Sequence, residues 1–168
     1  MNKINKISIK YGLLAGVAII AYYLLFYLIR PEMIFQLAIW WGGLIPLLVF
    51  QFLGVSKVRM VLDGGISVAE GLRTAFFVYI LGVLLFYIFY FVLLKYIDPD
   101  LILAQKEIAL RNLEKMNAGK SKDLEQFKEY YEQDQPEVTL KGLLFRYVQS
   151  LIAGFILSLG IAYIFRTK

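Results

Sequence analysis

Four long stretches without a charged side chain constrain what this chain can fold into. They cover residues 11–29, 33–55, 75–94 and 147–165. An α-helix needs roughly 20 mostly apolar residues to cross a hydrocarbon core about 30 Å thick. Lipid offers no hydrogen-bond partner to an exposed backbone, so each stretch has to satisfy its own backbone groups as a helix. The pattern predicts an all-α, polytopic membrane protein, with four transmembrane helices forming a single domain over residues 1–168.

Composition and charge agree with this prediction. Hydrophobic residues make up 60% of the 168 residues, whereas soluble domains contain roughly 45–50%. A soluble chain of this length has too little interior to bury so much apolar surface. The net charge is +5, but the charges avoid the four stretches and form no basic stripe with interleaved aromatic residues. We therefore expect the lipid bilayer, and no nucleic acid, as a partner.

The distribution of Lys and Arg predicts the orientation. With the N-terminus inside, segments 1–10, 56–74 and 166–168 carry eight basic and two acidic residues. The long segment 95–146 carries nine basic and ten acidic residues, and long segments count less in the positive-inside rule. Both termini are expected in the cytoplasm and residues 95–146 outside it. Tyr147 is expected at the membrane–water interface on the side away from the cytoplasm.

Residues 95–146 are expected to form an amphipathic helical hairpin between the third and fourth spans. Asp98 is placed to cap a first helix, with Pro99 at its first position. Leu101, Ile108 and Leu113 contribute to a broad apolar face of that helix. A second helix is expected from Ser121 to Gln135.

The loop before the third span has its own signals. Asp63, Gly64 and Gly65 predict a turn. Ser67 and Glu70 match a capping box, in which each side chain satisfies the other residue's backbone N–H. The third helix is therefore expected to begin at Ser67.

The order and spacing of several short motifs resemble a known family. The pieces are a basic start, Gly64-Gly65-Ile66-Ser67 before the third span, Ile97-Asp98-Pro99 after it, a charged helical loop, and Gly154 within the last span. Over residues 6–166 they resemble the bacterial membrane family known as domain of unknown function 4199 (DUF4199), found mainly in Bacteroidota. The resemblance implies a four-span protein of the bacterial inner membrane. Combined with the orientation expected from the basic residues, this puts the 95–146 segment in the periplasm. It implies no established activity and no functional residues.

The sequence offers little for catalysis or for cofactors. It contains no cysteine and no histidine, which excludes thiol nucleophiles, imidazole bases, haem ligation and Cys/His zinc sites. No Asp, Glu, Lys or Arg lies within the four stretches, although such residues are the usual mark of a proton relay. Asp98 and Asp100 are the closest pair for a hard cation, but they do not share a helix face. We expect no metal, no cofactor and no enzymatic activity.

A proline within the second span predicts a break in that helix. Pro46 cannot donate a hydrogen bond to the carbonyl of Gly42. The freed carbonyls could bind a cation, as in the broken helices of transporters, or the break could be an ordinary packing kink.

Small residues recur at four-residue spacing in two spans. They are Gly12 and Gly16 in the first, and Ser150, Gly154, Ser158 and Ala162 in the last. Such stripes allow helices to approach closely. They could serve packing within the chain, or contact with another copy or a different subunit.

The leading hypothesis is a non-catalytic accessory or scaffolding subunit of a membrane complex. Its contacts with another membrane protein would use the small-residue stripe of the last span and the apolar face at Leu101, Ile108 and Leu113. The alternative is a small transporter or pore, formed by a homo-oligomer, with its conduction path at Gly42 and Pro46. A membrane lipid-modifying enzyme is the remote alternative.

Overall fold

The computed structural model describes residues 3–116 and 139–167, and every regular element in them is helical. The elements are α1 (Lys3–Ile29), the 3-10 turn η1 (Pro31–Phe35), α2 (Leu37–Gly42), α3 (Leu44–Val61), α4 (Val68–Val92), the π-helical turn η2 (Leu93–Ile97), α5 (Leu101–Met116) and α7 (Leu140–Phe165). Among the described residues, four segments are long and apolar enough to cross a membrane: Lys3–Ile29, Leu37–Val61, Val68–Ile97 and Leu140–Phe165. The expected all-α, polytopic fold is confirmed.

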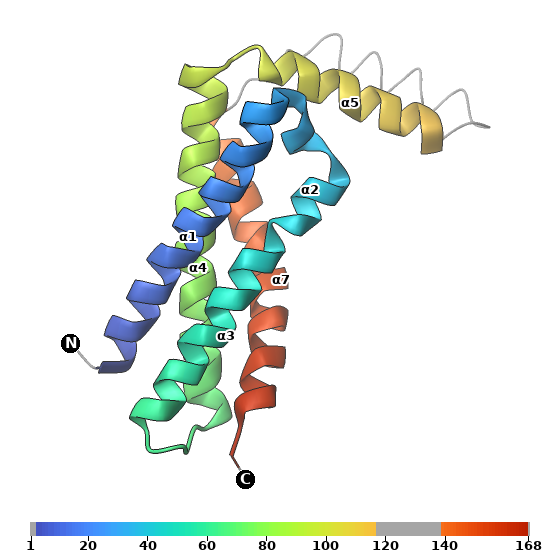
Figure 1. Ribbon diagram of the computed structural model, residues 1–168. Helices are drawn as coiled ribbons and strands as arrows, with labels where there is room; N and C mark the ends of the chain where they lie inside the picture. The colour runs from blue at the N-terminus through green and yellow to red at the C-terminus, as the bar shows by residue number, and fades with distance from the viewer. Residues whose placement is uncertain (1–2, 117–138, 168) are drawn as a thin grey trace.

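The central helix of the bundle is α4. It packs against α1, α3 and α7, and α7 packs mainly on α4 (Figure 1). In the most apolar part of the segment Val68–Ile97, which contains α4, 44% of the residues are buried. The corresponding share is 28% for α1 and for α7. Both chain ends lie toward the same end of the bundle, here called the C-terminal end, and α5 runs across the opposite end, the α5 end (Figure 1).

The first and last helices extend beyond the uncharged stretches. α1 begins at Lys3 and α7 at Leu140, so that Lys6, Lys10 and Arg146 lie within helices. All three of these side chains are exposed, and long basic side chains can lie along apolar surface while the charged group reaches water. Thr139 explains where α7 starts, because its hydroxyl accepts a hydrogen bond from the Gly142 N–H at 3.1 Å.

The second span is not a continuous α-helix over residues 33–55. Its start lies in η1, the helix is interrupted at Gly43, and α3 continues beyond residue 55 to Val61. Pro31 explains the tight turn of η1, since proline at the first position of a helical turn has no N–H to satisfy.

The capping box that begins α4 is confirmed. The Glu70 N–H donates to the Ser67 hydroxyl at 3.3 Å, and the Ser67 N–H donates to Glu70 Oε2 at 3.0 Å. The turn before it has a positive φ at Asp63 (53°) and at Gly64 (89°). Thr167 fixes the chain end beside this turn, because its hydroxyl accepts from the Ile66 N–H at 2.8 Å.

Helix α5, which follows α4, begins later in the chain than the sequence pattern suggested. The first residue of α5 is Leu101, rather than Pro99, and the Asp98 carboxylate accepts a hydrogen bond from the Tyr27 hydroxyl at 3.2 Å. Asp98 therefore connects the end of α1 to the turn before α5. The second helix expected from Ser121 to Gln135 lies outside the described residues.

Candidate functional site

Gly12 and Gly16 of α1 lie at the contact with α4. A Cβ atom at Gly12 would lie 2.8 Å from Leu81 Cβ, and one at Gly16 would lie 2.6 Å from Leu85 Cδ1. Both distances are shorter than ordinary carbon–carbon contacts. These glycines therefore serve close packing of α1 on α4 within the chain.

The small-residue stripe of α7 also faces α4. The Tyr79 hydroxyl donates to the Ser150 carbonyl at 3.0 Å, and a side chain at Gly154 would overlap the Tyr79 ring. Two turns further on, Ala162 lies against Gly71, whose added Cβ would be 3.2 Å from Ala162 Cα. The stripe is therefore covered by the chain's own central helix, and a partner cannot use it without displacing α4.

Ser158, the remaining residue of the stripe, belongs to a buried polar contact between three helices. Gln51 Nε2 donates to the Ser158 hydroxyl at 3.0 Å and to the Ala75 carbonyl at 3.2 Å. Both side chains are fully buried, and Gln51 Oε1 has no hydrogen-bond partner among the described residues. This contact joins α3, α4 and α7.

Two tyrosines of α1 donate hydrogen bonds to backbone carbonyls beside the break in the second span. The Tyr22 hydroxyl donates to the Ile39 carbonyl at 3.2 Å, and the Tyr23 hydroxyl donates to the Trp40 carbonyl at 3.4 Å. Gly42 lies against Tyr22, and Gly43 against Tyr23, so the glycines make room for the two rings. Pro46 lies in the first turn of α3, where a missing N–H costs little. Two of the carbonyls before the break thus have donors within the chain.

The face proposed for the outer helix is partly covered by the chain. Leu101 is 3% exposed and belongs to the main hydrophobic core. Ile108 is half-buried and lines a pocket with Arg30, which lies between α1 and η1, and with Glu32 of η1. Leu113 lies in α5, and its side chain lies outside the described ones.

The outward face of α7 carries a second group of small and polar residues, which the sequence analysis did not single out. Gln149, Ala153 and Gly160 are exposed and lie on the side of α7 away from α4. The side-chain amide of Gln149 has no hydrogen-bond partner in the described part of the chain. A Cβ at Gly160 would meet no atom within 4 Å. We call these three residues the outward face of α7.

Two tyrosine contacts give the depth of this face. Tyr79 bonds the carbonyl of Ser150, and the Tyr147 hydroxyl donates to the Ile80 carbonyl at 3.4 Å. Tyr79 and Ile80 lie at the middle of α4. Gln149, between Tyr147 and Ser150, therefore lies at the level of the middle of the central helix, although it points away from that helix. Tyr147 is not at the outer end of the bundle, where the sequence pattern had suggested it.

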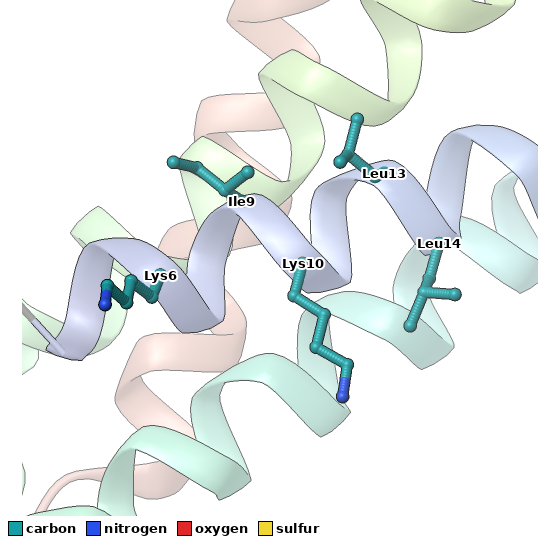
Figure 2. Close-up of a pocket in the computed structure, with 5 residues that line it drawn as sticks. All are labelled: Lys6, Ile9, Lys10, Leu13 and Leu14. Carbon is teal, nitrogen blue, oxygen red and sulfur yellow. The ribbon is translucent and has the colours of Figure 1, made fainter.

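Two surface pockets differ in character. One is an open strip of about 470 Å³ on α1, lined by Lys6, Ile9, Lys10, Leu13 and Leu14, all from one helix (Figure 2). The other, of about 450 Å³, lies at the α5 end, where η1 meets α5, and is lined by Arg30, Glu32, Gln36, Ala104, Glu107, Ile108 and Arg111. Only the second pocket combines several elements and both signs of charge.

Groups suited to a metal ion are scarce in the part of the chain that the structure describes. In residues 3–116 and 139–167, no three His, Cys, Asp or Glu side chains come together as a metal site would require.

The fold defines a class: an all-α, multi-pass membrane protein built around one central helix. The match to protein families is more specific. Residues 10–167 match the family described as "Protein of unknown function (DUF4199)", and the chain belongs to this family. No curated protein and no solved structure matches the chain.

Proposed function

We propose that this protein is a non-catalytic accessory or scaffolding subunit of a bacterial inner-membrane complex. It binds a transmembrane helix of another membrane protein through the outward face of α7. The observation that carries this proposal is Gln149, an exposed amide without a partner in the described chain, opposite the middle of the central helix. Ala153 and Gly160 continue the same face.

The physical reason lies in the cost of an amide in hydrocarbon. A polar side chain at this depth is favoured when it bonds to a neighbouring helix. Small residues beside it let that helix approach closely, which increases packing contacts where lipid supplies no hydrophobic drive. The small-residue stripe facing α4 cannot provide this contact, because Tyr79 and Gly71 already cover it.

The orientation belongs to the same proposal. The positive-inside rule favours the cytoplasm for the C-terminal end, which carries Lys57, Arg59 and Arg73. In that orientation both termini are cytoplasmic, and α5 lies on the periplasmic side.

The transporter alternative receives less support from the geometry. It needs free carbonyls at the break in the second span. The Tyr22 and Tyr23 hydroxyls donate to the Ile39 and Trp40 carbonyls there, although not to the Gly42 carbonyl, which Pro46 leaves without its helical donor. A lipid-modifying enzyme remains the remote alternative, since both inner-loop acids have structural places: Asp63 in the turn and Glu70 in the capping box.

A site-specific cross-link tests the proposal. A photoreactive residue at Ile156, which is 64% exposed between Ala153 and Gly160, is introduced into the protein in its native membrane. We expect one cross-linked product of defined mass, in which the reacting peptide is a transmembrane segment of a different protein. Ala153→Leu should remove this product because the bulkier side chain keeps the partner helix away.

The matched control is Ala21→Leu, the same change at an exposed alanine of α1. It should leave the cross-link unchanged. A cross-link to a second copy of this chain would overturn the accessory proposal in favour of a homo-oligomer. A product that contains only lipid would show that the outward face of α7 has no protein partner.

A further inference from the structure

The pocket between η1 and α5 has a charge pattern that points to a ligand. It is lined by two arginines, Arg30 and Arg111, and by two carboxylates, Glu32 and Glu107. All four side chains are exposed. Within the described residues, none of them forms a salt bridge or a hydrogen bond through its side chain. The charges line one pocket without neutralising one another in direct pairs.

A ligand that complements this set carries one anionic and one cationic group. Arginine offers several N–H donors in a planar arrangement that matches the oxygens of a phosphate. Carboxylates accept hydrogen bonds from a primary ammonium group. A volume of about 450 Å³ is within the usual range for small-ligand sites.

The surroundings of the pocket are those of a membrane interface. The chain neighbours of two lining residues are exposed and apolar: Ile29 beside Arg30 is 67% exposed, and Leu37 beside Gln36 is 69% exposed. Trp41 of α2 is 61% exposed, and tryptophan is enriched where membrane meets water. A molecule held in the pocket would thus have its polar part among charges and its apolar part beside α1 and α2.

We propose that this pocket binds the zwitterionic phosphoethanolamine headgroup of a phospholipid. Arg30 and Arg111 hold the phosphate, and Glu32 and Glu107 hold the ammonium group. A choline headgroup fits less well, because its quaternary nitrogen has no N–H to donate and is bound better by aromatic faces. A glycerol headgroup leaves both carboxylates without a cation. The site is independent of the outward face of α7, so either proposal can fail alone.

Lipid titration by native mass spectrometry tests the site. The purified full-length protein in detergent is titrated with dioleoyl lipids that differ only in headgroup: phosphatidylethanolamine, phosphatidylcholine and phosphatidylglycerol. We expect phosphatidylethanolamine to bind about tenfold more tightly than the other two, which corresponds to one well-formed charge-assisted hydrogen bond. Soluble glycerophosphoethanolamine is titrated in parallel; competition by it shows that the headgroup is recognised without the acyl chains, and its failure to compete assigns the site to the intact lipid.

Charge-neutralising variants separate the two halves of the site. The double variant R30Q/R111Q should lower phosphatidylethanolamine affinity about tenfold or more. E32Q/E107Q should abolish the preference over phosphatidylcholine while keeping phosphatidylglycerol binding. R146Q, at an exposed arginine of α7 outside the pocket, is the matched control and should bind like the unmodified protein. Equal affinities for the three lipids, or unchanged selectivity in correctly folded R30Q/R111Q and E32Q/E107Q, would overturn the proposal.

Discussion

Single residues determine how closely the helices approach. Gly154 lies against the Tyr79 ring, so that α7 reaches α4 at a point where any side chain would overlap the tyrosine. Gly160, less than two turns further along α7, faces open space. The two glycines share a helix and differ only in what lies beside them, which makes them a matched pair.

We predict opposite effects for alanine at these two glycines. Gly154→Ala should destabilise the protein by about 1–3 kcal/mol, because the added methyl group forces Tyr79 or the helix to move. Gly160→Ala should be neutral or stabilising by up to about 1 kcal/mol, since alanine favours a helix more than glycine does. Thermal unfolding of both variants in the same detergent measures the difference. Equal losses of stability would show that Gly154 is not at a tight contact.

The buried amide of Gln51 makes a contact that could not be predicted from the sequence. From the sequence, the second span was only an uncharged stretch, and the stripe in the last span was a surface either for packing within the chain or for contact with a partner. Sequence spacing cannot tell that Gln51 Nε2 meets Ser158, a residue 107 positions away. The sequence does not specify which helices are neighbours or how they are rotated, and the contact depends on both.

Helices were predictable where a local rule decides, and less so at their ends. The uncharged stretches indicated all four spans, and the capping box located the start of α4 at Ser67. Two helix starts were misjudged because a charged side chain was taken as the limit of a span. α1 begins at Lys3 and α7 at Leu140, since exposed lysine and arginine can remain in a helix while their charged groups reach water.

The capping box yields a prediction at the scale of the element. Ser67→Ala should lower the stability by about 1 kcal/mol, because the Glu70 N–H loses its acceptor at the start of the central helix. Ser67→Thr keeps a hydroxyl at this position and should stay within about 0.5 kcal/mol of the unmodified protein. Denaturation of the three proteins in one detergent provides the comparison. A loss as large for threonine as for alanine would mean that the hydroxyl does not act as the cap.

The outward face of α7 could not be identified from the sequence, because the sequence does not specify which side of α7 faces α4. The small-residue stripe at Ser150 and Gly154 was visible in the sequence, but not the helix it would face. Once Tyr79 places that stripe on α4, the exposed residues are those about half a turn away, including Gln149. In the sequence Gln149 is the only amide of the stretch 147–165, and its significance depends on the rotation of α7.

At the scale of the whole molecule, the two ends of the bundle differ. The C-terminal end holds the α3–α4 turn and the chain end, joined by the hydrogen bonds between Ile66 and Thr167. The α5 end holds η1, α5 and the polar pocket between them. The proposed partner helix binds between these ends, and the proposed phospholipid headgroup binds at the α5 end. Both proposals require that the two ends lie on opposite sides of one membrane.

Cysteine accessibility tests this arrangement most directly, because the chain contains no cysteine of its own. Single-cysteine variants at Asp63, Leu103 and Arg166 are expressed in a bacterial host and treated in spheroplasts with a membrane-impermeant maleimide. Leu103 of α5 is 60% exposed, and we predict labelling of its variant alone; permeabilisation should allow labelling of all three. Labelling at Asp63 and Arg166 but not at Leu103 would reverse the proposed orientation. Equal labelling of Asp63 and Leu103 in intact spheroplasts would contradict the placement of the two ends on opposite sides.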